Sequence, residues 1–344
     1  MNLKNIKRIC VVDTVYTLFL YYLICGINEN DIFIMSSGIP ESIRKNINHI
    51  YFPPLKYKEY SNSSKILKIK QRMTNICHRF YYILKIRLIL FIKTKKNETE
   101  VYGHGHLIYS FPIYEHDKSY LIEDGLNNYL SLTEPIYNNS LSSNILKFFG
   151  FHTNHLSECF GTHKNIKKVY LTKNKFPEII KSKVEVINIK ELWNKKTETE
   201  KNKILKVFNT QNLINNIKDN QILLLTQCFS EDDLLPFNEE IKIYKELIEN
   251  QENSNIIIKT HPREQKDYSK IFQNMTIIDK PFPLELLKCA DIKINKVITV
   301  SSTAALNFMD ECEIEIYDRE TSSKEVNNYI YSLKKELLIL NKNE

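Results

Sequence analysis

The chain has 344 residues, which is enough for two domains of ordinary size. Hydrophobic residues make up 42% and charged residues 26%, the balance of a soluble globular protein, so a mainly disordered chain is excluded. Seven glycines are too few for a collagen-like or glycine-rich sequence. The seven cysteines are dispersed and form no C-x-x-C pair, which argues against a disulfide framework or structural zinc and favours a reducing compartment.

The net charge of +7 is concentrated in one stretch of the chain. Residues 61–96 contain ten Lys and Arg and no Asp or Glu, so the remaining residues are slightly acidic, at −3. A local excess of this kind indicates one positive surface and not a protein that coats nucleic acid.

Two apolar segments resemble membrane spans at first sight. Residues 9–27 follow three basic residues, as in a signal sequence, but Asp13 and Thr14 interrupt the apolar run and no small-residue cleavage site follows. We therefore expect a buried strand at 9–12 that leads into a buried helix. Residues 80–92 are too short to span a bilayer and contain two basic residues, which predicts a core or interfacial helix. No transmembrane segment is expected.

Short apolar runs alternate with helical patterns along the rest of the chain, which indicates parallel sheets covered by helices on both faces. The strands expected in the first half are 9–12, 31–35, 107–111, 120–122, 169–172 and 184–187. The second half predicts strands at 222–226, 255–260, 275–278, 296–299 and 313–317, with helices at 239–250, 283–289 and from about 303. The expected fold class is α/β, with two Rossmann-like domains whose parallel sheets face a central cleft.

The domain boundaries follow from the composition. Residues 1–187 are expected to form the N-terminal Rossmann-like domain, and residues 221–317 the C-terminal Rossmann-like domain. The motifs described below assign nucleotide binding to the second domain and leave the acceptor side to the first. The polar, helix-prone residues 188–220 predict a connecting helical segment, in which Trp193 is expected to pack. Residues 318–344 predict a C-terminal helix and tail.

A His-Pro step closes the strand expected at 255–260. Proline disfavours a helical conformation in the residue before it, so His261 is expected to be extended at the strand end, where ligands bind in open α/β sheets. A histidine there can donate to a phosphate or protonate a leaving group, and Lys259 and Arg263, on either side of Pro262, would add charge-assisted contacts. The alternative is a histidine that only closes the strand by bonding to backbone.

Three hydroxyl side chains, Ser301, Ser302 and Thr303, follow the strand expected at 296–299 and open a helix. Such residues can cap a helix, and its free N–H groups with the helix dipole form an anion site. A plain N-cap is the alternative. Because His261 and Ser301 end strands of the same expected sheet, the two features together predict nucleotide binding more strongly than either alone.

Acidic groups follow two further strands. Glu123 and Asp124 precede Gly125, which allows a tight turn that exposes a carboxylate able to accept a proton from an acceptor hydroxyl. Gln227 and then Glu231, Asp232 and Asp233 follow the strand at 222–226, and these acids compete with Asp124 for the role of base. No D-x-D pair occurs, which disfavours a metal-dependent reaction.

His104 and His106 flank Gly105 on one expected strand face, with His116 nearby. Zinc requires a third or fourth ligand at closer spacing, so a structural role is favoured over lining of the acceptor site, and no metal site is expected.

The motifs IEDG, KTHPRE and SSTAA, in this order and separation, resemble those of bacterial sialyltransferases. The wider segments YLIEDG, TQCFSEDD, IYKELI and IIIKTHPREQKDYS are most similar to glycosyltransferase family 52, the lipooligosaccharide sialyltransferases, over about residues 100–310. The resemblance implies a GT-B fold and an inverting, metal-independent sialyltransferase without a cofactor. Such an enzyme would move sialic acid from CMP-sialic acid to a terminal galactose of a lipooligosaccharide or capsular glycan, with an α-2,3 linkage expected.

The resemblance also implies roles for residues. His261 would assist the departure of the CMP phosphate, which Ser301 and Ser302 would hold. The base would be Asp124 by comparison with related sialyltransferase families, or Asp232 or Asp233 by comparison with family 52. Both possibilities stay open, with Glu123, Gly125 and Gln227 expected on the acceptor side.

The expected partners are the donor, a glycolipid acceptor and an anionic membrane surface that residues 61–96 would contact, so a cytoplasmic, peripheral location at the inner face of the bacterial membrane is expected. A homodimer is implied by the resemblance, and no nucleic acid is expected. Two alternatives remain: a GT-B transferase for another nucleotide sugar, and a non-catalytic protein that binds membrane surfaces through the basic stretch.

Overall fold

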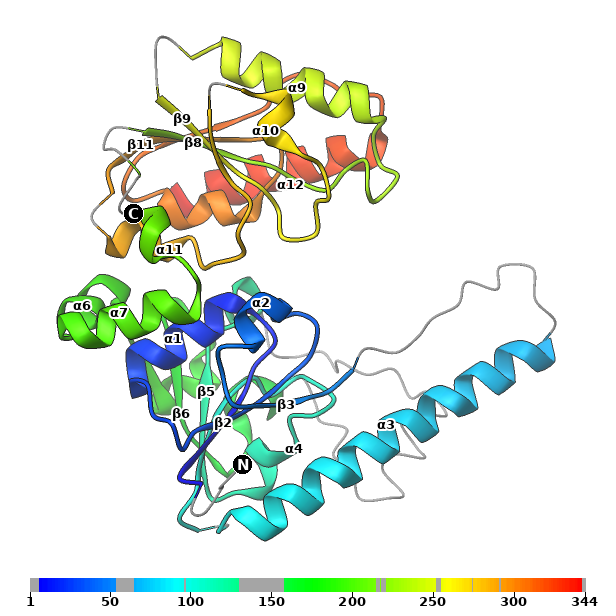
Figure 1. The fold of residues 1–344 in the computed structure, drawn as a ribbon, viewed down its shortest axis with the longest axis vertical. Helices are drawn as coiled ribbons and strands as arrows, with labels where there is room; N and C mark the ends of the chain where they lie inside the picture. Colours follow the sequence, from blue (N-terminus) through cyan, green and yellow to red (C-terminus); the bar gives the residue numbers. More distant parts are fainter. Residues whose placement is uncertain are drawn as a thin grey trace. The chain divides into compact units, whose positions relative to one another are not determined.

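The computed structural model describes residues 6–53, 65–95, 97–129, 158–214, 217, 221–251, 255–273, 275–290 and 292–341. The chain divides into two compact units, residues 1–208 and 209–344, and the division falls inside the segment expected to connect two domains. Each unit contains one parallel sheet with helices around it (Figure 1). The expected α/β class with two Rossmann-like domains is therefore confirmed.

The first unit has seven parallel strands in the order β3-β2-β1-β4-β5-β6-β7. The strands are β1 (Arg8–Val11), β2 (Ile32–Met35), β3 (His49–Tyr51), β4 (Glu100–Gly103), β5 (Lys118–Ile122), β6 (Ile166–Leu171) and β7 (Val184–Val186). Its helices are α1 (Val15–Cys25), α2 (Glu41–Arg44), α3 (Lys65–Lys93), α4 (Phe111–Glu115), α6 (Ile189–Asn194) and α7 (Glu198–Val207), with short helical turns η1 (Leu126–Tyr129), η2 (Glu158–Thr162) and η3 (Glu178–Lys183).

The second unit has five parallel strands in the order β10-β9-β8-β11-β12. The strands are β8 (Gln221–Leu225), β9 (Asn255–Lys259), β10 (Thr276–Ile278), β11 (Ile294–Thr299) and β12 (Glu313–Ile316). The helical elements are α8 (Gln211–Ile214), α9 (Phe237–Glu249), α10 (Tyr268–Ile271), α11 (Glu285–Cys289), η4 (Thr303–Phe308) and α12 (Lys324–Asn341).

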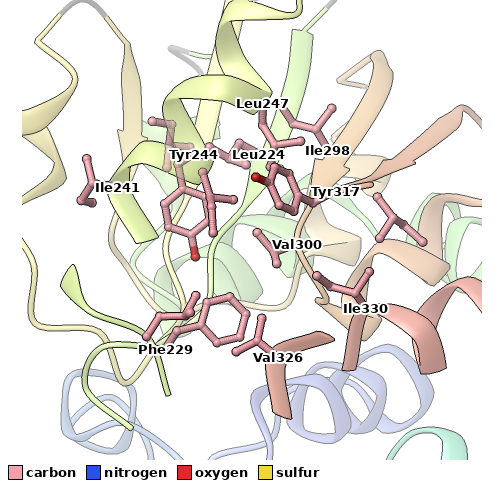
Figure 2. Close-up of a cluster of buried hydrophobic side chains, with 14 of the residues drawn as sticks. Leu224, Phe229, Ile241, Tyr244, Leu247, Ile298, Val300, Tyr317, Val326 and Ile330 are labelled. Atoms are coloured by element: carbon pink, nitrogen blue, oxygen red, sulfur yellow. The ribbon is translucent and has the colours of Figure 1, made fainter. Parts of the chain in front are cut away.

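One apolar cluster holds the second unit together. Alternate residues of the central strands, such as Leu224 and Ile298, pack with Tyr244 of α9 and with Val326 and Ile330 of α12 (Figure 2). All five side chains are 8% exposed or less. Because strand residues two apart point to the same face, this packing fixes which strand residues point away from the cluster and keeps the strand ends rigid.

Residues 9–27 contain most of β1 and all of the buried helix α1. The strand and the buried helix expected there are therefore confirmed. Trp193 of α6 packs against Phe19 of α1 with ring centroids 6.3 Å apart, so it is the packing residue that was expected. The helix expected at 80–92 is the C-terminal part of a much longer one, α3, whose N-terminal part projects from the first unit (Figure 1). Among the described residues, no helix combines the length and apolar character needed to cross a bilayer.

One predicted strand is wrong, and with it the predicted position of two histidines. Residues 107–111 are not a strand: the Ser110 hydroxyl accepts from the Leu107 N–H and donates to the His104 carbonyl, which closes a turn before α4. The strand at this place is β4, so His104 and His106 follow a strand end and do not lie on a strand face. The helix expected from about Thr303 is present as η4, a six-residue helix of the 3-10 type.

Candidate functional site

The candidate residues lie at the carboxyl ends of parallel strands in both units. In the first unit, Asp13 follows β1, His104 follows β4, and Asp124 follows β5, and these three strands are neighbours in the sheet. In the second unit, His261 follows β9, Thr226 follows β8, and Ser301 follows β11, again on neighbouring strands. This edge is where ligands bind in open parallel sheets.

Asp124 is surrounded by polar side chains of the first unit. Its Oδ1 accepts a hydrogen bond from the Thr14 hydroxyl at 3.0 Å and lies 3.2 Å from His104 Nε2, while its Oδ2 lies 3.2 Å from His106 Nε2. The Asp124 N–H donates to the Asn128 side chain at 2.9 Å. Burial opposes ionisation of Asp124, but His104, His106 and Thr14 outweigh it and lower the pKa of the carboxyl below its ordinary value. Asp124 is therefore an ionised, 17% exposed carboxylate held in one orientation.

The two histidines form a column with an aromatic ring. The rings of His104 and His106 stack with centroids 5.3 Å apart, and His106 stacks on Phe160 at 5.7 Å. Gly105 makes this possible, because a Cβ at that position would lie 2.3 Å from the Cys159 carbonyl oxygen. Burial lowers the pKa of His104 to about 4, so its imidazole is neutral at pH 7.

The surroundings of Glu123 and Gly125 indicate structural roles for both residues. The Glu123 carboxylate is buried and accepts hydrogen bonds from the Tyr129 hydroxyl and from the amide and hydroxyl of Thr172, at 2.5 to 2.7 Å. Gly125 has φ 124°, a conformation that side chains disfavour, so the glycine is needed for the turn itself.

Asp13 is a candidate that the sequence interpretation missed, since it was considered only as an interruption of an apolar run. It lies at the same strand edge, and its Oδ1 accepts from the Ser36 N–H at 3.2 Å. Burial raises the pKa of Asp13, with the nearby Asp124 charge adding to the effect. The available signal was its position directly after a buried strand.

His261 is fixed by its own turn in the second unit. Its N–H donates to Glu264 Oε2 at 2.6 Å and to the Thr226 hydroxyl at 3.2 Å. Its Nδ1 accepts from the Arg263 N–H at 3.2 Å, so the neutral ring carries its proton on Nε2. Burial lowers the pKa of His261, with Arg263 and Lys259 adding to the effect. The result is a neutral imidazole whose Nε2–H can donate to a ligand.

Glu264 connects this turn to the core of the unit. Its Oε1 accepts from the Tyr268 hydroxyl at 2.6 Å and lies 3.3 Å from Lys266 Nζ, and its Oε2 accepts from Thr226. The Lys266 ammonium also lies 2.6 Å from Glu231 and 2.9 Å from Glu240. These three carboxylates cluster as metal ligands do, but the ammonium occupies the space among them. Nothing in the sequence except the spacing of Glu264 from His261 pointed to this network.

The remaining basic and acidic candidates of the second unit are paired. Arg263 and Asp232 form two parallel bonds of 2.8 and 2.9 Å, and Arg263 lowers the pKa of Asp232, which weakens it as a base. Lys259 is buried and donates to the Thr260 carbonyl at 2.7 Å, and burial lowers its pKa to about 8. Asp233 is exposed, with a positive φ of 56°.

The hydroxyl-rich segment differs from the expected helix cap. The Ser302 N–H donates to the Thr299 hydroxyl at 3.1 Å, and the Ser302 side chain does not cap η4. Because η4 is short and of the 3-10 type, a strong helix dipole is not available at Ser301 and Thr303. Gln227 follows the neighbouring strand β8. Its backbone N–H donates to the buried Tyr244 hydroxyl at 2.8 Å, and its carbonyl accepts from that hydroxyl at 3.2 Å.

The fold matches solved structures of one class. An α/β-galactoside α-2,3-sialyltransferase from Photobacterium phosphoreum aligns with a TM-score of 0.55 and 14% identity, over 98% of this chain and 97% of that one. The GT-B domain of a sialyltransferase from Photobacterium damselae aligns with a TM-score of 0.55 and 13% identity, over 96% of each chain. The fold is therefore that of the GT-B glycosyltransferases, as expected.

Sequence comparisons identify the family to which the chain belongs. An uncharacterized protein of Haemophilus influenzae strain Rd is 33% identical over 322 residues, which cover 92% of this chain and 96% of that protein. The model of glycosyltransferase family 52 matches residues 39–322. The chain belongs to glycosyltransferase family 52, which confirms the family suggested by its motifs, and it is a glycosyltransferase.

Proposed function

We propose that this glycosyltransferase is an inverting sialyltransferase that moves sialic acid from CMP-sialic acid to a terminal galactose of a lipooligosaccharide or capsular glycan, in α-2,3 linkage. The observation that carries the proposal is the fixed His261, whose Nε2–H donor lies at the same sheet edge as Ser301 and Ser302. The two Photobacterium sialyltransferases that share the fold support sialic acid as the transferred sugar, and the α-2,3 specificity of one of them supports the linkage.

The proposed reaction is a single displacement. The acceptor hydroxyl oxygen bonds to the anomeric carbon while the bond from that carbon to the phosphate oxygen breaks, and the electron pair leaves with CMP. His261 Nε2–H and the serine hydroxyls stabilise the charge that develops on the phosphate. The acceptor proton passes to a carboxylate, and one displacement converts the β-linked donor into an α-linked product.

Asp124 is our preferred base. It is ionised and oriented by Thr14 and the two histidines, whereas Asp232 is engaged by Arg263 in two short bonds. Asp233 remains the alternative in the second unit, because it is exposed and no ion pair occupies it among the contacts of the described residues. No metal is required in this scheme, since His261 and the hydroxyl groups supply the stabilisation of the leaving group.

The direct experiment incubates the protein with CMP-sialic acid and a lactose-ended acceptor, with and without EDTA. We expect CMP release, an α-linked product by NMR, and the same rate with chelator. Replacing Ser301 and Ser302 together by Ala should mainly weaken CMP binding. If UDP-sugars are consumed and CMP-sialic acid is not, the donor assignment is wrong and the alternative GT-B transferase holds.

We also propose that α3 attaches the enzyme to an anionic membrane, where a glycolipid acceptor resides. Ile83, Ile86 and Leu90 are buried against the first unit. The opposite side of the helix is apolar too, and its exposed side chains are Met73, Tyr81, Leu84, Leu88, Phe91 and Ile92, from 45% to 85% exposed. Tyr81, Leu84, Leu88 and Phe91 recur at intervals of three and four residues, and the helical repeat brings Met73 and Ile92 to the same side, so the six side chains form one stripe along the helix.

The positive charge of residues 61–96 indicates that the apolar stripe contacts an anionic lipid surface and not a second copy of the chain. Residues 61–96 carry ten basic and no acidic side chains, so pairing two copies through α3 would bring like charges together, whereas an anionic lipid surface attracts them. Some of these charges are used within the unit, because Arg87 pairs with Glu115. We expect the protein to sediment with anionic but not neutral liposomes at low salt and to be released by high salt. Leu88→Glu should abolish sedimentation, whereas Ile179→Glu, at another exposed apolar position, should not. A dimer in solution that persists without lipid would instead assign the stripe to self-association.

A further inference from the structure

A second chemistry is available where the first unit brings His104, His106 and Asp124 together. One ligand atom from each side chain can be chosen so that all three lie within 4.8 Å of one another. The two histidine Nε2 atoms each lie 3.2 Å from a different oxygen of Asp124. Zinc bonds of about 2.0–2.1 Å in a tetrahedral arrangement put neighbouring ligand atoms about 3.3 Å apart, and each of the two N···O distances matches this spacing.

His104 provides the independent sign that a ligand belongs here. Its side chain is fully buried, yet neither ring nitrogen makes a hydrogen bond. Its Nε2 is close enough to Asp124 to do so but lacks the required direction, as expected when both atoms point toward a common third point. Buried polar groups are normally satisfied, and a bound cation would satisfy this one.

The three side chains are also held in place before any ligand binds. His104 follows β4 directly and His106 is stacked between His104 and Phe160. The Thr14 hydroxyl donates to Asp124 Oδ1, which fixes the carboxylate from the side of β1. Rigid ligands on neighbouring strand ends lose little entropy on binding a metal.

We propose that His104, His106 and Asp124 form a binding site for a divalent transition metal ion, with zinc as the best match. Two imidazole nitrogens and one carboxylate oxygen are the donor set that such ions prefer over calcium or magnesium. Three protein ligands leave a fourth position open for water or a ligand oxygen. The cluster of Glu231, Glu240 and Glu264 has no comparable capacity, because Lys266 lies among its carboxylates.

The test uses the full chain without an affinity tag, after treatment with EDTA. The protein carries Cys77→Ser, because the Cys77 thiol is exposed and would bind zinc on its own. Calorimetry with zinc should give one equivalent of tight binding. Cobalt(II) should give visible absorption bands of a four- or five-coordinate site without the near-ultraviolet thiolate band. His106→Ala and Asp124→Asn should each weaken binding by at least roughly tenfold, judged from the effect of losing even an outer-shell partner. Circular dichroism checks that the variants are folded.

His49→Ala is the matched control, since His49 is a half-buried histidine of the same unit outside the cluster. Wild-type protein that binds neither metal, or His106→Ala that binds as tightly as His49→Ala, overturns the proposal. Binding is measured without donor or acceptor, so failure of the metal site leaves the proposed transfer reaction intact, and the reverse also holds. If both hold, a metal on Asp124 blocks the preferred base, and zinc should inhibit the parent enzyme.

Discussion

Glu264 is a positioning residue for His261, and Glu264→Gln tests that role. The carboxylate accepts from the His261 N–H and Thr226 with one oxygen and from Tyr268 with the other, beside Lys266. A glutamine can keep a carbonyl oxygen toward His261, but its amide group then faces the Lys266 ammonium.

The expected magnitude follows from these contacts. Hydrogen bonds to a charged group are worth about 1.5–3 kcal/mol, against about 0.5–1.5 kcal/mol for neutral pairs. The Glu264 side chain is 1% exposed, and its burial raises the pKa of the carboxyl, which offsets part of the benefit of its charge. We therefore expect Glu264→Gln to lower the free energy of unfolding by about 2 kcal/mol. If about 1.4 kcal/mol of that is lost from the orientation of His261, turnover falls roughly tenfold.

The assay compares two variants by urea denaturation and by steady-state kinetics at a temperature where both are folded. Glu231→Gln is the control, because Glu231 contacts Lys266 and the Gln265 N–H but not His261. It should lose similar stability while keeping near-normal turnover. A positioning role of Glu264 is refuted if Glu231→Gln lowers turnover as much as Glu264→Gln, or if Glu264→Gln leaves turnover unchanged.

Three further predictions concern the chemistry. His261→Ala should lower turnover by roughly 10²-fold or more with little change in folding, as for other acid catalysts, and normal turnover would remove His261 from the mechanism. Asp124→Asn should abolish transfer but leave CMP binding intact, while Asp232→Asn and Asp233→Asn should be mild; the opposite order would place the base in the second unit. An NMR titration should show a pKa of His261 below its ordinary 6.5 in the free protein. With CMP bound the pKa should be higher, because the phosphate favours the charged imidazole, and CMP binding near that pKa should therefore take up protons. A pKa that CMP leaves unchanged would show that His261 does not contact the phosphate.

Most strands were predictable because their apolar runs are long enough to stand out from their neighbours. The exceptions are β3, which is only the three residues His49–Tyr51, and β4, whose sequence Glu-Val-Tyr-Gly is short and follows a polar stretch. The later run at 107–111 looked more strand-like, since its Leu, Ile, Tyr and Phe do pack in the core, but they do so from a turn and the start of α4. Local pattern reports burial, and it cannot distinguish a buried turn from a buried strand.

That single error hid the arrangement around Asp124. Asp124 and His104 are 20 positions apart, and they meet only because β4 and β5 are neighbours. In the second unit, His261 and Ser301 could be assigned to one sheet edge because both strands were identified. The bonds that orient His261 through Glu264 could not be predicted, since they depend on how the Thr226 and Tyr268 side chains and the His261 N–H converge on one carboxylate in three dimensions.

The left-handed backbone of Asp233 has a consequence for any mutational survey of this enzyme. At φ 56°, a residue with a plain Cβ is strained by roughly 1 kcal/mol, whereas Asn and Gly adopt this conformation readily. Alanine scanning would thus report a loss at Asp233 that arises from the turn after β8 and not from a missing carboxylate. Natural variation at this position should be restricted to Asp, Asn and Gly whether or not the position takes part in catalysis, and a glycine there would preserve the turn while removing the whole side chain.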